Sequence, residues 1–414
     1  MRMPSKKFSI GLTAVLAIFS VTLVATGTRA AAQTETVLLS FNGSNGQFPF
    51  GGLIFDGTGN LYGTTRQGGA HNLGTVFELT PKAGGGWSEK LLHSFGNGVD
   101  GQNPSCTLVM DAAGNLYGTT NGGGPNGGGI AFELTPKASG GWSEKLVHSF
   151  GFVSLDGTGP NAGLIFDASG NLYGTTINGG AYGDGTVFEL TLAAGGGWAE
   201  KILHHFRQNG RDGFFPFGSL ILDAAGNLYG TTQGGGRYYY GTVFELTPTA
   251  RGPWSESILH DFNQNGTDGG TPLSNLIFDA AGDLYGTTAA GGTYGYGTAF
   301  ELIPAGGGAW TEEILHSFDI TDGSTSWAGL IFAGSGNLYG TTVLGGPHNN
   351  GTVFKLTPTT GGGWTEQVLY AFDAQAGING PYDGLILDAA GNLYGTAENG
   401  GPHGAYGTVF EVTP

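Results

Sequence analysis

The sequence contains one cysteine, Cys106, among its 414 residues. An intramolecular disulfide and a Cys-x-x-Cys metal knuckle are therefore excluded. Charge is also scarce: 11% of the residues are charged, with 15 lysines and arginines against 32 aspartates and glutamates. The basic residues are scattered singly and the formal net charge is −17. Nucleic acid and anionic membrane surfaces suit such a chain poorly, so we expect neither as a partner.

The short signatures of common catalytic sites are missing as well. No Gly-x-Ser-x-Gly, His-Glu-x-x-His, Walker or dinucleotide-binding pattern occurs in a suitable context. The many Gly-x-Gly pairs are not followed by helical segments, so we interpret them as turn glycines. We expect no cofactor and no metal ion.

Long apolar runs are limited to the N-terminus. Residues 8–24 form an apolar stretch that follows three basic residues, and Ala30-Ala31-Ala32 offers a small-x-small cleavage site. This pattern predicts a signal peptide over residues 1–32 and a secreted protein, either extracellular or periplasmic. An uncleaved anchor is the alternative, but the apolar run is short for a span of ~20 residues. After cleavage we expect no membrane association, and we expect a monomer.

Glycine is the most unusual feature that is present, with 83 copies. These glycines have no three-residue period, which excludes collagen. The chain is also 39% apolar and 12% aromatic, which argues against disorder. A chain rich in both glycine and aromatic residues is typical of many short strands joined by tight turns.

Two motifs divide the chain into seven repeats of about 55 residues. The first is N-L-Y-G-T-T, with slight variation, and the second, G-T-V-F-E-L, follows it with its phenylalanine 15 residues after the tyrosine in six repeats and 16 in the last. The tyrosines of the first motif are Tyr62, Tyr117, Tyr173, Tyr229, Tyr285, Tyr339 and Tyr394. Such regular self-similarity indicates a repeat architecture rather than several unrelated domains.

Each repeat contains four strand-like segments rich in β-branched and aromatic residues. In the third repeat they are residues 163–167, 171–176, 185–190 and 198–206. Four short strands in each of seven repeats predict an all-β fold, a seven-bladed β-propeller of four-stranded blades over residues 33–414.

The two ends of the chain complement each other. The seventh repeat stops at Pro414 before its fourth strand, and residues 34–41 match that missing strand. We therefore expect the N-terminal strand to complete the last blade as its outer strand, which removes an open sheet edge. An open β-solenoid is the alternative, but it does not require such an exchange.

The paired motifs G-N-L-Y-G-T-T and G-T-V-F-E-L resemble the GloVer (Gloeobacter/Verrucomicrobia-type) tandem-repeat family of secreted bacterial proteins. The resemblance covers residues 34–414, and D-A-A-G-N-L-Y is more loosely similar to NHL and gluconolactonase-like propellers. The resemblance to the GloVer family implies an exported repeat protein, sometimes tethered to the cell surface by a C-terminal sorting segment. The chain stops at Pro414 inside the last blade, so we do not expect tethering by that route. The resemblance implies no reaction and no catalytic residues.

The first residue of each innermost strand is expected to line a central channel. These residues are Gly52, Thr107, Gly163, Ser219, Asn275, Gly329 and Gly384. They are small and uncharged, whereas a catalytic propeller needs converging carboxylates, histidines or a metal. Asp383 alone places a charge beside the channel entrance. The sequence therefore favours a protein without catalysis.

Aromatic and imidazole side chains recur on loops that a propeller would place on one face. The loop after the second strand carries His71, Tyr182, Tyr238, Tyr240, Tyr294, Tyr296, His348 and His403, with Asn126 in the second blade. The D-G-x-x-P loops add Phe50, Phe217, Trp327 and Tyr382. Flat apolar rings with polar edges suit sugars or protein partners, so these residues form our predicted binding site. The alternative is that they only fill gaps between glycine-rich loops.

Other repeated residues have structural interpretations. We interpret the L-H-S-F histidines as packing residues, and likewise the tryptophan that begins the fourth strand of each repeat. We interpret the aspartate that ends the first strand as a turn cap. The D-G-x-x-P aspartates are spread singly over the blades, so a calcium site there would need backbone ligands. His348, His403 and His71 fall on neighbouring blades, but loops about 12 Å apart cannot share a zinc ion without large inward folding.

Together these observations predict a secreted, non-catalytic repeat protein that binds a glycan or an extracellular protein through its aromatic loop face. The first alternative is a polysaccharide lyase or hydrolase that uses Asp383. The second is a purely structural module of the cell envelope. Near-identical repeats favour binding, because enzymes need asymmetry whereas multivalent binders do not.

Overall fold

The computed structural model describes residues 33–96, 98–151, 155–250, 252–334, 336–373 and 380–414. The predicted signal peptide lies outside this part of the chain. Among the described residues, no helix has the length and apolarity needed to span a bilayer.

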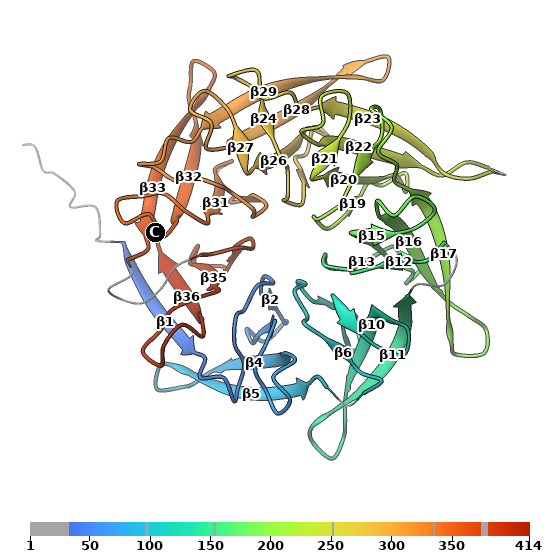
Figure 1. The fold of residues 1–414 in the computed structure, drawn as a ribbon. Coiled ribbons are helices and arrows are strands. Elements are labelled where there is room, and N and C mark those ends of the chain that lie inside the picture. Colours follow the sequence, from blue (N-terminus) through green and yellow to red (C-terminus); the bar gives the residue numbers. More distant parts are fainter. Residues whose placement is uncertain (1–32, 97, 152–154, 251, 335, 374–379) are drawn as a thin grey trace, which may run out of the picture. The chain divides into compact units, whose positions relative to one another are not determined.

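Residues 33–414 form one compact unit of seven antiparallel sheets arranged in a ring (Figure 1). Blade 1 consists of β2 (Ile54–Phe55), β3 (Leu61–Thr65), β4 (Thr75–Pro81) and β5 (Trp87–Ser94). Blade 2 consists of β7 (Val109–Met110), β8 (Leu116–Thr120), β10 (Gly127–Pro136) and β11 (Trp142–Gly151). Blade 3 consists of β13 (Ile165–Phe166), β14 (Leu172–Thr176), β16 (Thr186–Leu192) and β17 (Trp198–His205).

The remaining four blades repeat this order from the channel outwards. Blade 4 consists of β19 (Ile221–Leu222), β20 (Leu228–Thr232), β22 (Thr242–Thr247) and β23 (Ser255–Asp261). Blade 5 consists of β25 (Ile277–Phe278), β26 (Leu284–Thr288), β28 (Thr298–Gly306) and β29 (Ala309–Ser317). Blade 6 consists of β30 (Ile331–Phe332), β31 (Leu338–Thr342), β32 (Thr352–Pro358) and β33 (Trp364–Ala371). Blade 7 consists of β34 (Ile386–Leu387), β35 (Leu393–Ala397), β36 (Thr408–Thr413) and β1 (Thr34–Ser40).

The seven-bladed propeller and its closure by the N-terminal strand are therefore confirmed. β1 pairs antiparallel with β36, with Thr34 opposite Thr413 and Ser40 opposite Thr408. Phe41, which follows β1, is fully buried in one cluster with Phe77 of blade 1. The N-terminal segment thus completes blade 7 and also packs against the blade that comes next in the ring.

The hydrophobic core lies between the blades, in seven clusters of the same design. Between blades 4 and 5, for example, Tyr229, Val243 and Phe262 meet Leu284 and Phe300. The tryptophan that begins the fourth strand packs against the motif tyrosine of the preceding blade, as Trp198 does on Tyr117 with ring centroids 6.3 Å apart. The interpretation of these tryptophans as packing residues is therefore confirmed.

A β-bulge interrupts the pairing of the third and fourth strands at the same point in every blade. In blade 3, Val187 pairs with His204 but Phe188 pairs with Ile202, so that Leu203 is the extra residue. A bulge changes which side of the sheet the following residues face. Leu203 consequently joins the core shared with blade 4, whereas Ile202 joins the core shared with blade 2.

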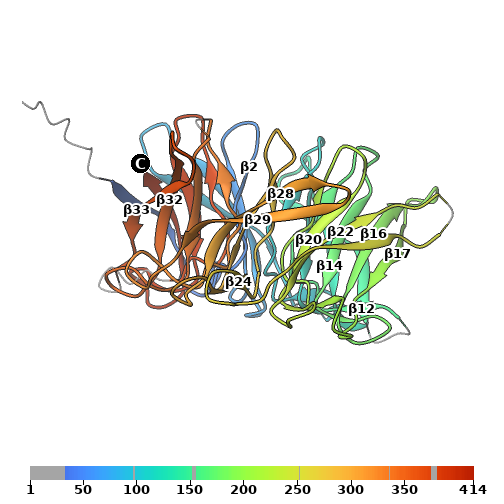
Figure 2. The same cartoon turned by 90° about the horizontal axis from the view of Figure 1, so that it is seen from above.

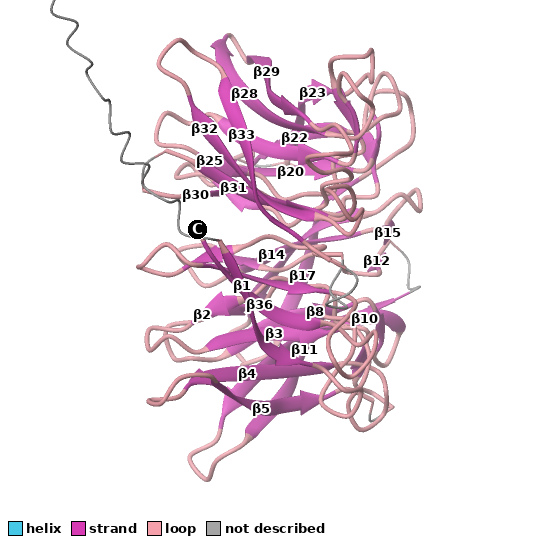
Figure 3. Ribbon diagram, turned by 90° about the vertical axis from the view of Figure 1, so that its left-hand side faces the viewer, coloured by secondary structure: helices cyan, strands magenta, loops and turns pink. Residues whose placement is uncertain are grey.

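The loops of one face are held together by very short strands. β6 (Gly101–Gln102) pairs with β9 (Gly122–Gly123), β12 (Gly157–Thr158) with β15 (Asn178–Gly179), β18 (Gly213–Phe214) with β21 (Gly234–Gly235), and β24 (Gly269–Gly270) with β27 (Ala290–Gly291). Figure 2 shows β12 and β24 at the same face, and Figure 3 shows β12 beside β15. The D-G-x-x-P loops and the loops after the second strands therefore share one face, as predicted. We call it the loop face.

Candidate functional site

Four aromatic side chains from different blades meet at the centre of the loop face. The Phe50 and Tyr382 rings stack with centroids 5.0 Å apart, and the Trp327 ring meets both edge-on, at 6.1 and 5.1 Å. Phe217 also meets Trp327 edge-on, with ring centroids 5.7 Å apart. We call these four residues the aromatic cluster. The sequence predicted their common face, and the structure brings them into direct contact.

The backbone before each ring explains how these side chains reach the axis. Phe48, Phe215 and Thr325, each two residues before a ring of the cluster, adopt φ values of 57° to 58°. Blade 7 uses Gly380, with φ 70°, at the equivalent position. This left-handed residue turns the chain sharply into the channel before the innermost strand begins.

A hollow of about 330 Å³ lies over the aromatic cluster, and we call it the central hollow. Phe50, Phe217, Trp327 and Tyr382 line it together with Arg66, Asn121, Asn161, Ile177 and Glu398. Its lining therefore combines flat apolar rings with one cation, one carboxylate and two amides. This combination is typical of small-ligand sites, in which a few polar groups fix the orientation of a ligand against apolar walls.

The polar side chains of the central hollow were not singled out by the sequence analysis. Arg66, Asn121, Ile177 and Glu398 all directly follow the second threonine position of the N-L-Y-G-T-T motif. The sequence does contain a signal that could have identified these residues: the residue at this position differs in all seven repeats, although the motif before it hardly changes. This position breaks the symmetry of the ring at its centre.

The charged groups of the central hollow interact with one another and with its rings. The Arg66 guanidinium carbon lies 5.6 Å from the centroid of Phe50. Burial raises the pKa of the Glu398 carboxyl, although the Arg66 charge and a hydrogen bond from Tyr382 oppose this shift. Burial and the nearby Glu398 raise the pKa of the Tyr382 phenol. The tyrosine therefore serves as a hydrogen-bond donor at neutral pH.

Asp383 lies beneath the aromatic cluster, at the edge of the channel. Its carboxylate accepts hydrogen bonds from the Gly52 amide at 2.5 Å, the Thr107 hydroxyl at 2.7 Å and its neighbour's amide, Gly384, at 2.6 Å. The channel itself has a volume of about 370 Å³ and is lined by the small first residues of the innermost strands and the apolar residues that follow them. Asp383 thus ties blade 7 to blades 1 and 2.

The predicted tyrosines on the outer loops lie away from the central hollow and do not line it. They are exposed: Tyr182 by 53%, Tyr238 by 46%, Tyr240 by 41%, Tyr294 by 59% and Tyr296 by 39%. They belong to blades 3, 4 and 5, and the Arg207 guanidinium lies 4.7 Å from the centroid of Tyr182. They form a separate set of exposed rings on one side of the loop face.

The predicted histidines His71, His348 and His403 are all exposed on their loops. In the described part of the chain, none of them belongs to a group of side chains close enough to share a metal ion. The structure therefore does not bring these three residues together.

Among the residues that the structure describes, five blade interfaces contain a group of one histidine, one aspartate and one glutamate, and we call these groups the interface clusters. They are His93, Asp100 and Glu144; His148, Asp156 and Glu200; His204, Asp212 and Glu256; His260, Asp268 and Glu312; and His316, Asp322 and Glu366. Within each cluster, the three potential ligand atoms lie within 4.8 Å of one another.

The interface clusters correct two sequence interpretations. The L-H-S-F histidines do pack on the phenylalanine two residues later, as His204 does on Phe206 at 4.7 Å, but packing is not their whole role. The aspartates of the D-G-x-x-P loops are not isolated, because each meets a histidine and a glutamate. Burial and the neighbouring Asp212 raise the pKa of Glu256 to about 9. The glutamate, which lies on the next blade, was not singled out.

Known structures show the same fold at low sequence identity. A putative 6-phosphogluconolactonase from Bacteroides uniformis is 13% identical, with a TM-score of 0.51 over 78% of this chain and 86% of that one. An ancestral GH74 enzyme is 11% identical, with a TM-score of 0.59 over 92% of this chain. The chain spans about half, 51%, of that enzyme's length. No curated protein matches the sequence.

The repeat motifs themselves identify the family. The Gloeobacter/Verrucomicrobia repeat matches residues 17–224 and 196–410, which together cover nearly all of the chain. The two matches overlap from the outer strand of blade 3 to the innermost strand of blade 4, so the family's repeat runs through the whole propeller. The chain therefore belongs to the Gloeobacter/Verrucomicrobia repeat family.

Proposed function

We propose that this protein is an exported, non-catalytic binding protein that holds a glycan in the central hollow of its loop face. The observation that carries the proposal is the lining of that hollow by four rings and, on its walls, Arg66 and Glu398. Sugars offer flat apolar faces for stacking and hydroxyl edges for hydrogen bonds, and this lining supplies both partners. Its volume also falls within the ~300–1,000 Å³ range of small-ligand sites.

An unused hydrogen-bond donor supports the same proposal. Trp327 lines the central hollow, and its Nε1–H is buried without a hydrogen-bond partner among the described residues. Buried indole N–H groups usually have a partner, because leaving one unpaired costs about 1–3 kcal/mol. A ligand hydroxyl or a water molecule held at this position would remove that cost.

Glycan cleavage is the second candidate, because an ancestral GH74 enzyme shares the fold. Glycoside hydrolases generally place two carboxyl groups ~5–9.5 Å apart on either side of the bond that they cut. The central hollow is lined by one carboxylate, that of Glu398. Asp383 lies below the rings and is already held by three donors. These features favour binding over cleavage.

A panel of soluble polysaccharides, scored for retention of the protein and for loss of polymer length, tests the proposal. We expect retention without shortening. Trp327→Phe keeps the ring but removes the N–H, so we expect about tenfold weaker binding, in line with the loss of one hydrogen bond. Arg66→Ala should weaken binding further, whereas Tyr238→Ala, on the outer loops, serves as the matched control and should bind normally.

Three results would contradict the proposal in different ways. Polymer shortening would favour the enzyme. Normal binding by Trp327→Phe and Arg66→Ala, together with a loss in the combined Tyr182→Ala, Tyr238→Ala and Tyr294→Ala variant, would move the site to the outer loops. Absence of retention on every polysaccharide would favour a protein partner or a purely structural role.

A further inference from the structure

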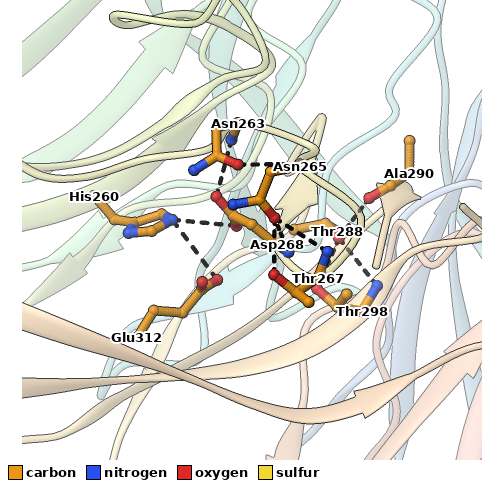
Figure 4. A network of polar contacts seen from close by, with 9 residues as sticks. All are labelled: His260, Asn263, Asn265, Thr267, Asp268, Thr288, Ala290, Thr298 and Glu312. Carbon is orange, nitrogen blue, oxygen red and sulfur yellow. Dashed lines mark hydrogen bonds and ion pairs between the residues drawn. The ribbon is translucent and has the colours of Figure 1, made fainter. Parts of the chain in front are cut away.

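The interface clusters are built from two successive blades. In Figure 4, His260 from the outer strand of blade 4 faces Asp268, from the loop that leads into blade 5, and Glu312, from the outer strand of blade 5. The His260 Nε2 atom lies 3.3 Å from Asp268 Oδ1 and 3.7 Å from Glu312 Oε1. The same three positions recur at four other interfaces, so the arrangement belongs to the repeat.

The β-bulge that recurs in every blade explains why the histidine points at the next blade. In blade 3 the bulge at Leu203 lets both Leu203 and His204 face blade 4. Glu200, three residues before the bulge, faces the opposite way and lies 3.5 Å from His148 of blade 2. One strand therefore supplies a histidine to one interface and a glutamate to the other.

In the three central clusters the histidine Nε2 atom lies 3.3 to 3.8 Å from the carboxylate oxygens, and the contacts of His204 and His260 with their aspartates are long hydrogen bonds of 3.3 Å. His148 Nε2 lies 3.8 Å from Asp156 and 3.5 Å from Glu200, and His204 Nε2 lies 3.3 Å from Asp212 and 3.5 Å from Glu256. A zinc ion binds nitrogen and oxygen at ~2.0–2.2 Å, so tetrahedral ligands lie about 3.3–3.6 Å apart. Nitrogen and carboxylate oxygens in these clusters are thus spaced like the ligands of one small cation.

Unpaired atoms point to a missing partner. In the cluster between blades 2 and 3, His148 Nε2, Asp156 Oδ1 and Glu200 Oε1 are all buried without a hydrogen-bond partner among the described residues. The Asp156 side chain is only 7% exposed. The imidazole of His148 and the carboxyl groups of Asp156 and Glu200 offer three ligand atoms within 4.8 Å of one another, and a divalent cation held between them would stabilise both carboxylates.

The blade 7/1 interface shows what happens when the histidine is absent. Leu39 takes the histidine position and Asn45 takes the aspartate position, while Glu89 keeps the glutamate. Asn45 Nδ2 donates a hydrogen bond of 2.8 Å to Glu89. Loss of the histidine therefore comes with loss of one carboxylate, and the remaining glutamate gains a neutral donor. This joint change indicates that the three residues act as one unit.

We propose that the clusters of His148, His204 and His260 each bind a divalent transition-metal ion of the zinc type, which pins two neighbouring blades together. Imidazole with carboxylates suits zinc and similar ions, whereas calcium and magnesium prefer oxygen ligands alone. Each histidine is 17–21% exposed, so the fourth position of the ion can hold a water molecule. The ion connects elements that belong to different blades and has a structural role. In the clusters of His93 and His316 the histidine and aspartate atoms lie only 3.0 and 2.9 Å apart, closer than two ligands of one tetrahedral ion, so we do not include them.

Metal titration of the full protein tests this inference. After treatment with EDTA, calorimetry with zinc chloride should give at least three ions per chain, and the midpoint of thermal unfolding should rise when zinc is added. Cobalt(II) in place of zinc should give the strong visible absorption of a tetrahedral site. His148→Gln, His204→Gln and His260→Gln should each remove one ion, and the triple variant should remove three. Circular dichroism checks that the variants remain folded.

A gain-of-site variant keeps the test valid even if the histidine variants unfold. The double variant Leu39→His, Asn45→Asp completes a cluster at the blade 7/1 interface, where Glu89 already occupies the glutamate position. This variant should bind one additional ion per chain. Tyr370→Phe, at the blade 6/7 interface, is the matched control and should leave the count unchanged. Fewer than three zinc ions per chain, an unchanged count in the triple histidine variant, or no added ion in the gain-of-site variant would each overturn the proposal.

Discussion

At the scale of single residues, the glycine of the N-L-Y-G-T-T motif has a steric explanation. In blade 5, a Cβ atom on Gly286 would lie 2.7 Å from Cζ of Phe300 and 2.9 Å from Cδ2 of Leu276. The other six blades repeat these contacts within about 0.2 Å, for example at Gly63 with Phe77. The phenylalanine ring of the third strand covers this glycine, so one motif depends on the other.

Gly286→Ala should therefore destabilise the protein through overpacking. The free energy of unfolding should fall by about 1–3 kcal/mol, because the Phe300 ring is fully buried and cannot move aside freely. Gly84→Ala is the control: its Cβ would meet nothing within 4 Å, and its effect should stay within ~0.5 kcal/mol. Urea unfolding of both variants measures the difference, and equal stabilities would contradict the steric argument.

At the scale of the element, the turn between the first and second strands is closed by an aspartate in six blades. Asp167 Oδ1 accepts hydrogen bonds from the amides of Ser169 and Asn171, at 2.8 and 2.9 Å, and Oδ2 accepts from the Asn171 side chain and the Tyr173 hydroxyl. The interpretation of this aspartate as a turn cap is confirmed. Although burial acts in the opposite direction, these hydrogen bonds hold the pKa of Asp167 below its ordinary value.

Blade 6 has Ala333 at this position, so Ala333→Asp should stabilise the protein by about 0.5–2 kcal/mol. A folded-state pKa below the unfolded value means that the unfolded state binds protons more readily as the pH falls. The gain should thus be full above the ordinary aspartate pKa of ~3.9 and disappear as the pH drops through the lower folded value. Urea unfolding at pH 7 and near pH 3 checks this dependence, and an equal gain at both would refute it. Ala333→Asn, an uncharged cap, is the pH-insensitive control.

The strands and their order could be predicted from the sequence because each blade is encoded locally. The four predicted segments of the third repeat agree with β13, β14, β16 and β17 to within two residues at each end. The interface clusters could not be found in this way. His148 and Glu200 are 52 residues apart in the sequence, and they meet only because the bulge turns the histidine towards the next blade. A bulge leaves no mark in a regular alternating pattern.

At the scale of the whole molecule, the centre of the ring is where the repeats differ most. The common loop face of Phe50, Phe217, Trp327 and Tyr382 could be predicted from repeat alignment. Their mutual contacts could not, since these depend on how seven blades converge on one axis. Apart from Asn161, the polar walls of the central hollow come from a single variable position of the repeat, as at Arg66. Near-identical blades thus build the scaffold, and the axis concentrates their few differences into one asymmetric site.

Ring closure is the other property of the whole molecule, and it depends on a strand held covalently at one end only. Phe41 and Phe150 occupy equivalent positions and are both fully buried, so Phe41→Ala and Phe150→Ala should each cost about 3–5 kcal/mol. The two substitutions should differ in which strands they destabilise. Phe150 lies in the middle of the chain, whereas loss of the Phe41 ring frees β1 to leave β36 without unfolding the other blades. Hydrogen exchange should therefore accelerate selectively in β1 and β36 of Phe41→Ala, and uniformly in Phe150→Ala. Equal exchange patterns in the two variants would mean that the closed ring unfolds as a single cooperative unit. The pairing of β1 with β36 would then be no weaker than any other contact of the ring.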